Sequence, residues 1–432
     1  MNENKIITSI HKAETQQPLD AQWYDRFHEN AAFQAYEYLI GNKEERTRQK
    51  ERFINGDVDA PTLDYPRLDE FDFDGYESNL LQLKADILSQ EQHDIVKNVY
   101  KWKINEKLAE LRMLRATKNG DDKRFKRYAQ FIYGKPEDDI TGYTMDNTMS
   151  LMTNVLNNPS SSDEQKKAAQ FVFDKITPIQ QSKYIEPPKT TGITDTPTQN
   201  TKYDSSAMKD RFETALQKYG LEGWSVLVSD EYTAVNVGQE LKEIRIPTER
   251  EVTNIQLQKL IAHEIGTHAL RRQNGERSKL RLLGLGLDRS KDDEGVATYQ
   301  EQKIDGAKDF SGFIGYFAIA LANNPDNNFK DVFEIIKNYH IANGKTIKKA
   351  QDFAWNRCVR TFRGTSCQMP GACFTKDMVY RENNVKVLNL IKSDASAENS
   401  FMMGKYDPTN PRHIWILSQL NITKEELDNL EK

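Results

Sequence analysis

Residues 260–272 read LIAHEIGTHALRR and carry most of the chemical information in this sequence. The segment holds two histidines and a glutamate, which are side chains that bind and assist a catalytic zinc ion. In the H-E-x-x-H helix of zinc hydrolases three residues separate the histidines. Four residues separate His263 from His268. The extra residue either removes the metal site or marks a variant of it.

Helix geometry decides between these two readings. In a regular α-helix, residues five apart point about 140° away from each other, so the two rings would not reach one ion. A π-helical turn absorbs one extra residue and restores a common face, and such turns are frequent at functional sites. Gly266 lies in the inserted stretch and costs about 1 kcal/mol inside a regular helix, which fits a place of local distortion. We therefore predict a π-distorted helix that presents both histidines to one metal.

The neighbouring residues predict that this helix packs on a small sheet. Thr253 and Gln256 match a capping box at its start, and Asn274-Gly275 is a typical end. Before it, β-branched and aromatic residues alternate between turn residues, which predicts three short strands. These strands are residues 223–230, 232–239 and 242–249.

The third metal ligand is expected on a later helix. A catalytic zinc takes three protein ligands and keeps one position open. Glu294 opens an apolar-periodic segment, and Gly295 after it allows another backbone to approach closely. Glu294 is therefore preferred as the ligand over Asp292, Asp293 and Glu301. Glu264 adjoins the first histidine and is the expected general base that takes a proton from the metal-activated water.

Composition excludes several classes of protein. The 432 residues have a net charge of -5 and no concentrated basic stripe, so no nucleic-acid partner is expected. The first residues have no apolar signal region, and the longest apolar run, 313–322, is too short for a membrane span. Cys358, Cys367 and Cys373 have no zinc-knuckle spacing. We expect reduced cysteines in a cytoplasmic protein without a membrane partner.

The chain divides into four predicted segments. Residues 1–77 form an N-terminal extension, partly helical, with a short helix expected within residues 31–41. Residues 78–186 have helical periodicity. Residues 187–204 are rich in Thr and Pro and form the predicted linker. Residues 205–432 form the catalytic domain, so the expected fold class is α+β, helix-rich, with a small β-sheet beside the zinc-binding helix.

At this point the sequence resembles a known family. HEIGTHALR followed by EGVATYQE is similar to the H-E-x-x-x-H metallopeptidases of the tyrosine carboxypeptidase family, which includes the microtubule-associated tyrosine carboxypeptidases and bacterial QEGLA-motif proteins. The resemblance runs from about residue 78 to the C-terminus. Further segments that carry it are RFKRYAQFIYGKP (124–136), EIRIPTE (243–249), RTFRGTSCQMPGACFTKDMVY (360–380) and GKYDPTNPRHIWILSQL (404–420).

The resemblance implies a zinc carboxypeptidase that removes a C-terminal residue, with Tyr and Glu considered, from a protein or peptide tail. It implies one Zn2+ per chain on His263, His268 and Glu294, with Glu264 as the base. The QEGLA segment reads DEGVA here, so Asp293 and Val296 depart from the family pattern beside the ligand.

A carboxypeptidase must also hold the terminal carboxylate of its substrate. Arg363 and Lys376 are the candidates, because cationic side chains pair with carboxylates. Tyr380 is a candidate donor to the oxyanion that forms during the reaction. By analogy with other zinc peptidases, residues 243–249 are expected to bind the peptide along a sheet edge.

Two alternatives remain open. Dipeptidyl peptidase III also uses H-E-x-x-x-H, but its second motif is richer in glutamate and its chain is longer. The other alternative is a non-catalytic regulator with a relic zinc site. Glu264 argues against that reading, because a structural site needs no base beside its ligand.

Overall fold

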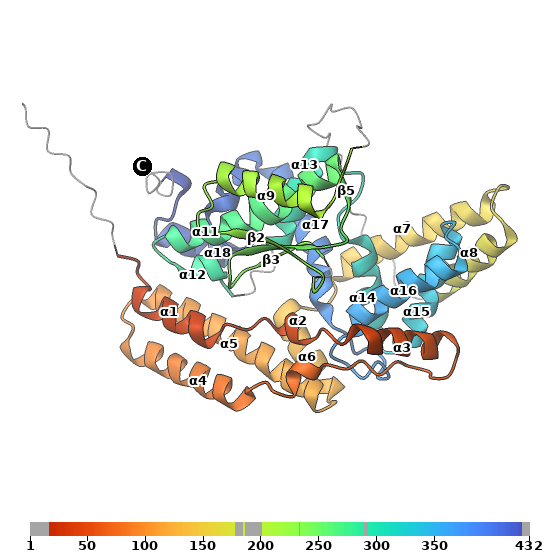
Figure 1. The fold of residues 1–432 in the computed structure, drawn as a ribbon, viewed down its shortest axis with the longest axis horizontal. Coiled ribbons are helices and arrows are strands. Elements are labelled where there is room, and N and C mark those ends of the chain that lie inside the picture. The colour runs from red at the N-terminus through yellow and green to blue at the C-terminus, as the bar shows by residue number, and fades with distance from the viewer. Residues whose placement is uncertain (1–16, 178–184, 186–200, 233, 289–292, 426–432) are drawn as a thin grey trace, which may run out of the picture.

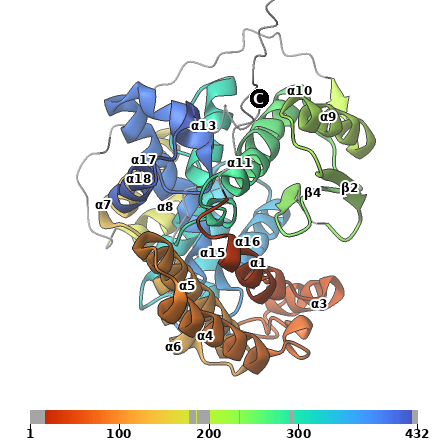
Figure 2. The same ribbon diagram turned by 90° about the vertical axis from the view of Figure 1, so that its left-hand side faces the viewer.

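The computed structural model describes residues 17–177, 185, 201–232, 234–288 and 293–425. Helices make up most of these residues, and the strands form two small sheets. The predicted helix-rich α+β class is therefore confirmed. In both views the N-terminal helices lie on one side of the molecule, and the three-stranded sheet with its covering helix lies on the other (Figures 1 and 2).

The N-terminal helices share a core with residues from the far end of the chain. Phe27 and Tyr100 from these helices are buried with Leu283 and Tyr406, which lie far downstream. Aromatic residues in the first 77 positions thus have a structural role, because they share a core with residues far downstream. The helices are α1 (Ala21–Asn30), α2 (Ala35–Tyr38), α3 (Lys43–Ile54), η1 (Pro66–Leu68), α4 (Phe73–Gln90), α5 (Asp94–Lys118) and α6 (Asp122–Tyr133).

A second core lies between helices from the middle and the later part of the chain. Met152, Phe317 and Trp355 are among its buried members. The apolar run at 313–322 lies in this core. No helix among the described residues is long and apolar enough to cross a bilayer. The helices are α7 (Asp138–Asn157), α8 (Asp163–Ile176), α14 (Phe313–Asn323), α15 (Phe329–Ala342) and α16 (Ile347–Phe362).

The three-stranded sheet has the order β2-β4-β3 and packs against the helix of the H-E-x-x-x-H segment. Strand β4 pairs parallel with β2 and antiparallel with β3. Ile244 and Ile246 of β4 share a buried cluster with Ile265 and Ala269 of that helix, which fixes the helix on the sheet. The strands are β2 (Ser225–Ser229), β3 (Asn236–Gly238) and β4 (Glu243–Pro247), covered by α9 (Ser205–Lys218).

The prediction that residues 243–249 offer a sheet edge is wrong. Strand β4 is the central strand: β2 pairs with it along Glu243–Pro247, and β3 pairs with its first three residues on the other side. The edges of this sheet are β2 and β3. Alternating apolar residues identified the strand but carried no information about its neighbours.

The linker and the remaining elements complete the chain. Most of the predicted linker 187–204 lies outside the described residues, but β1 (Lys202–Tyr203) falls within it and pairs with β5 (Val252–Thr253). The division into four segments stays a prediction. The other elements are α10 (Asn254–Leu260), η2 (Ile261–Ala269), α11 (Leu270–Arg277), α12 (Leu282–Leu285), α13 (Asp293–Asp305), η3 (Thr375–Met378), α17 (Val379–Ser393), η4 (Ala395–Met403) and α18 (Pro411–Gln419).

Candidate metal centre

The H-E-x-x-x-H segment forms a π-helix, as the spacing predicts. Helix α10 begins at the capping box of Thr253 and Gln256, and residues Ile261–Ala269 then take the wider π-helical form before α11 continues it. The hydroxyl of Thr267 donates to the carbonyl of Ala262, five residues earlier, at 2.8 Å. The helix ends at Arg277, so the expected end at Asn274-Gly275 is wrong by two residues.

The π-helix brings the two histidines together. The ring centroids of His263 and His268 are 4.8 Å apart, with the ring planes at 75°. Gly266 lies between them, and a Cβ at this position would come within 3.0 Å of the hydroxyl of Tyr219. The glycine therefore leaves room for a neighbouring ring as well as permitting local distortion.

Helix α13 supplies the third carboxylate. Glu294 is the second residue of this helix. Gly295 allows α13 to lie against α17, because a Cβ there would meet the backbone of Asn383 at 2.7 Å. The predicted close approach at this glycine is confirmed. Asp292 lies outside the described residues.

The ligand atoms of His263, His268 and Glu294 all lie within 4.8 Å of one another. Oε2 of Glu294 is 3.4 Å from Nε2 of His263 and 3.5 Å from Nε2 of His268. Ligand atoms around a tetrahedral zinc are about 3.4 Å apart at the usual bond lengths. Two imidazoles and one carboxylate are also a donor set of catalytic zinc sites.

Oε2 of Glu294 is buried and forms no hydrogen bond within the described part of the chain. A buried carboxylate oxygen without a donor is costly, and a cation at this point would remove that cost. Burial raises the pKa of Glu294, but its contacts with His263 and His268 outweigh burial and hold the pKa well below the usual range. The carboxylate is therefore ionised, and the three residues fit a divalent metal.

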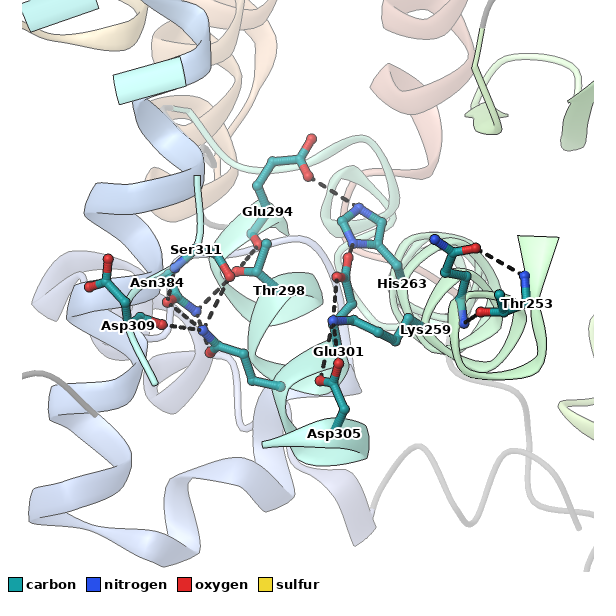
Figure 3. A network of polar contacts seen from close by, with 12 residues as sticks. Thr253, Lys259, His263, Glu294, Thr298, Glu301, Asp305, Asp309, Ser311 and Asn384 are labelled. Carbon is teal, nitrogen blue, oxygen red and sulfur yellow. Dashed lines mark hydrogen bonds and ion pairs between the residues drawn. The ribbon is translucent and has the colours of Figure 1, made fainter. Parts of the chain in front are cut away.

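Glu301 orients the first histidine instead of joining the ligands. Its Oε1 lies 2.5 Å from Nδ1 of His263, while Nε2 of the same ring faces Glu294 (Figure 3). Lys259 lies beside Glu301 and bridges to Asp305 at 3.1 Å. Metal-binding histidines typically pair their second nitrogen with a carboxylate in this way, which fixes the tautomer and the ring.

Polar contacts also hold α13 on α17. Asn384 donates to the hydroxyl of Thr298 at 3.1 Å and to Oε1 of Gln302 at 2.9 Å (Figure 3). Thr298 in turn donates to the carbonyl of Glu294 at 2.8 Å. The backbone of Glu294 is therefore fixed by the neighbouring helix.

Glu264 is buried beside the ligands, with an exposed fraction of 7%. Burial raises the pKa of its carboxyl group, although His263 and His268 act against this effect. The carboxylate forms no hydrogen bond or ion pair with any residue that the structure describes. It is available to accept a proton.

Lys376 and Tyr380 both lie close enough to Glu294 for its charge to affect their pKa values. The pKa of Lys376 is lowered by burial, partly offset by Glu294. The pKa of Tyr380 is raised well above its usual value, first by burial and then by the charge of Glu294. The Lys376 ammonium lies 6.0 Å from the centre of the Tyr380 ring. The structure therefore brings both predicted side chains to Glu294.

Arg363 lies in a different environment. It is surrounded by Arg360, Asp377, Tyr65 and Arg46, and burial together with Arg360 lowers its pKa to about 10. Glu294 contributes to the raised pKa of the neighbouring Arg360, which pairs with Asp377 through two hydrogen bonds. The role predicted for Arg363 stays a prediction.

Tyr36 is a residue at the site that the sequence did not indicate. Burial raises its pKa to about 12, with contributions from the charges of Glu37, Glu294 and Glu264. The Lys376 ammonium lies 5.3 Å from the centre of its ring. No local signal could have found it, because Tyr36 belongs to a four-residue helix more than 200 residues before the metal helix. Glu301 did have a signal, since it lies two helical turns after Glu294 on the same face.

The family model described as microtubule-associated tyrosine carboxypeptidase (MATCAP) matches residues 166–425, more than half of the chain. The chain belongs to this family. It is thus a member of a carboxypeptidase family of metallopeptidases, and it carries a candidate metal group of two histidines and one glutamate. Comparisons with curated proteins and with solved structures give no match.

The MATCAP match begins after the N-terminal helices. Tyr36 of α2 lies outside the matched residues. It nevertheless lies beside Lys376, and the charges of Glu294 and Glu264 help to raise its pKa. The surroundings of the candidate metal group are therefore built partly by residues of this chain that the family model does not cover.

Proposed function

We propose that this member of the MATCAP family is a zinc carboxypeptidase that releases one residue from the C-terminal tail of a protein or peptide. The observation that carries the proposal is the group of His263, His268 and Glu294, with the unpaired Glu264 carboxylate beside it. The family model supports the reaction class.

His263, His268 and Glu294 would hold one Zn2+ per chain. When bound, the ion supplies a Lewis acid that polarises the scissile carbonyl and makes water a better nucleophile. Glu301 keeps Nε2 of His263 directed at the ligand group, because its carboxylate accepts a hydrogen bond from Nδ1 of the same ring. The α17 contacts keep Glu294 in place.

Glu264 is the general base in this proposal. Its buried carboxylate takes a proton from the attacking water and passes it to the nitrogen of the leaving residue, so that the peptide C–N bond breaks. Burial in a poorly solvated site raises its pKa, which improves its ability to hold that proton between the two steps.

Lys376 is the proposed partner of the substrate's terminal α-carboxylate. It is the cation beside Tyr36, Tyr380 and Glu294, and it forms no ion pair within the described residues. Tyr380 donates its hydroxyl hydrogen bond to the developing oxyanion, because burial keeps the phenol protonated.

The first test combines metal content with the direction of cleavage. We expect about one zinc per chain in wild-type protein and a large loss in Glu294→Ala, measured by elemental mass spectrometry. Peptides with a free C-terminus should lose one residue, whereas C-terminally amidated peptides should stay intact. Blocking of cleavage by N-terminal acetylation instead would support the dipeptidyl peptidase alternative.

The second test separates catalysis from binding. Glu264→Gln should keep the zinc and lower the cleavage rate by at least about 1,000-fold, because only the proton acceptor is lost. Glu222→Gln, which changes an exposed carboxylate before β2, is the control and should keep the wild-type rate. Wild-type activity in Glu264→Gln would exclude the proposed mechanism, and absence of zinc from wild-type protein would favour a non-catalytic role.

A further inference from the structure

Three lysines, Lys103, Lys107 and Lys376, line one cavity of about 230 Å3, but their charges are balanced in different ways. Lys103 pairs with Glu106 at 2.9 Å, and Lys107 pairs with Glu110 at 2.8 Å. Lys376 forms no ion pair with any residue that the structure describes. An ammonium group withdrawn from water is costly unless something offsets its charge.

The adjacent carboxylate of Asp377 does not serve Lys376, because arginines occupy it. Nη1 of Arg357 donates to its Oδ2 at 3.0 Å, and Nη2 of Arg360 donates to its Oδ1 at 2.9 Å. Both oxygens of this buried carboxylate therefore have a cationic partner. The same contacts fix η3, the short helix that carries Lys376.

Two tyrosine rings lie beside the Lys376 ammonium instead of a carboxylate. Its Nζ is 5.3 Å from the centre of the Tyr36 ring and 6.0 Å from the centre of the Tyr380 ring. The face of an aromatic ring attracts a cation within about 6 Å. A ring face offsets the positive charge but leaves the N–H groups of the ammonium available to a stronger acceptor. Lys376 is therefore suited to bind an anionic ligand.

Tyr36 is held in place because its short helix, α2, is fixed to its surroundings. The carboxylate of Glu37 lies 3.4 Å from Nη1 of Arg245 in the central strand β4. Ala35 and Leu39 are buried in the core of the N-terminal helices. A helix of four residues has little stability of its own, so these contacts determine where the Tyr36 ring lies.

Lys376 is also placed by the helix that packs on the candidate metal group. Its helix, η3, runs directly into α17. The backbone of Asn383 on α17 lies against Gly295, because a Cβ on that glycine would come within 2.7 Å of it. Gly295 follows Glu294, and Tyr380 is about one helical turn before Asn383. The packing of α17 on α13 therefore ties the position of Lys376 to that of Glu294.

We propose that Tyr36 is a positioning residue, which holds the Lys376 ammonium ready for the terminal α-carboxylate of the substrate. This inference rests on the proposed function, in which Lys376 binds that carboxylate. The ring keeps the ammonium in place, and the carboxylate accepts its N–H groups on binding. Tyr36 lies outside the residues that the family model matches, so this role gives the N-terminal helices a part in substrate binding.

The test uses two peptides of one sequence that end in tyrosine, one with a free carboxylate and one amidated. Both are titrated by calorimetry into zinc-loaded Glu264→Gln protein, which should bind the free acid at least about 10-fold more tightly. Adding Tyr36→Leu should lower this ratio by about 3- to 10-fold, because the attraction between ring and ammonium is lost. Tyr36→Phe keeps the ring and should recover most of the ratio. Unchanged binding of the amidated peptide shows that each variant is folded.

The control is Tyr38→Leu in the same helix. The Tyr38 ring packs on Phe71, with centroids 4.6 Å apart, and lies 5.0 Å from the guanidinium of Arg67, so this change should keep the ratio.

A double-mutant cycle separates positioning of Lys376 from direct contact with the peptide. Lys376→Met should weaken binding of the free acid, and adding Tyr36→Leu to it should cause no further loss. A further loss as large as that caused by Tyr36→Leu alone would overturn the inference. In the active protein, Tyr36→Leu should raise KM by about 3- to 10-fold and leave kcat within about 2-fold, because binding changes and the chemical step does not.

The two proposals can fail separately. Cleavage of neither peptide by the wild-type protein would overturn the proposed function, and calorimetry would still decide the role of Tyr36. Equal binding of the free acid and the amide by protein that retains Tyr36 would overturn the inference, as would a ratio that Tyr36→Leu leaves unchanged.

Discussion

Nδ1 of His263 lies 2.5 Å from Oε1 of Glu301, and Nε2 of the same ring lies 3.4 Å from Oε2 of Glu294. One helix, α13, thus supplies both the carboxylate that orients the histidine and the carboxylate that joins it as a candidate ligand. The two glutamates are seven residues apart, which places them on one face of the helix. The ring of His263 is held between them.

This arrangement predicts the effect of Glu301→Gln. Loss of the charged acceptor should weaken the hold on the His263 ring and lower zinc affinity by about 10- to 100-fold, measured by competition with a chromophoric chelator. Asp305→Asn is the matched control, because Asp305 is one turn further along α13 and contacts Lys259 but not the histidine. Equal zinc affinity in wild type and Glu301→Gln would contradict an orienting role.

The contact between α13 and α17 predicts that Gly295→Ala is destabilising. The added Cβ would meet the backbone of Asn383 at 2.7 Å, and backbone atoms on a packed helix do not move aside easily. We expect a loss of about 1–3 kcal/mol in the free energy of unfolding, measured with urea. Gly266→Ala should cost less, because its nearest contact is the side chain of Tyr219, which is 39% exposed. The reverse order would contradict this account.

The buried contacts of Asp20 predict how much this residue contributes to the free energy of unfolding. This fully buried carboxylate accepts hydrogen bonds from the backbone N–H groups of Arg281 and Leu282, each at 2.9 Å, and from the Tyr100 hydroxyl at 2.8 Å. Asp20→Ala leaves these donors unpaired and should lower the free energy of unfolding by about 2–4 kcal/mol.

The control for this change is Asp25→Ala. Asp25 is largely exposed, and its ion pair within the described residues is a 3.3 Å contact with Arg281, so its removal should cost less than about 1 kcal/mol. Urea unfolding of both variants gives the comparison. A loss below 1 kcal/mol for Asp20→Ala would show that the N-terminal helices are held mainly by their apolar contacts.

The burial of Glu382 predicts that the stability of the protein depends on pH. Burial raises the pKa of this carboxyl group to about 7 in the folded protein, whereas its usual value is 4.5. The folded state therefore binds a proton more tightly than the unfolded state. Stability from this group is full below pH 4.5 and is lost as the pH rises through 7.

Glu382→Gln should remove that dependence. The amide oxygen can still accept from the backbone N–H of Glu137, which lies 2.9 Å from the glutamate, and no buried charge forms at high pH. At pH 8 the variant should be more stable than wild type by up to about 3 kcal/mol, while at pH 4 the two should agree. Thermal unfolding across pH 4–8 measures the difference. A constant difference at all pH values would exclude Glu382 as the titrating group.

The candidate metal group was largely predictable from the sequence because its signals are local. The distance between His263 and His268 required a π-helical turn, and Gly295 marked a close helix contact next to Glu294. The capping box at Thr253 and the alternating residues of β2, β3 and β4 located the helix and its sheet. Helix geometry and strand alternation are properties of short segments, so they can be read without knowing the fold.

Other features depended on contacts between distant segments. Strand order made β4 the centre of its sheet, and alternation within one strand does not specify its partners. Tyr36 lies close enough to Glu294 and Glu264 for their charges to raise its pKa, although local sequence only weakly marks its helix. The sequence by itself determined the metal-binding helix and its ligand types, because these follow from spacing along one chain segment. The tertiary structure alone decided which distant side chains surround that group, because burial and pairing arise only when separate segments pack together.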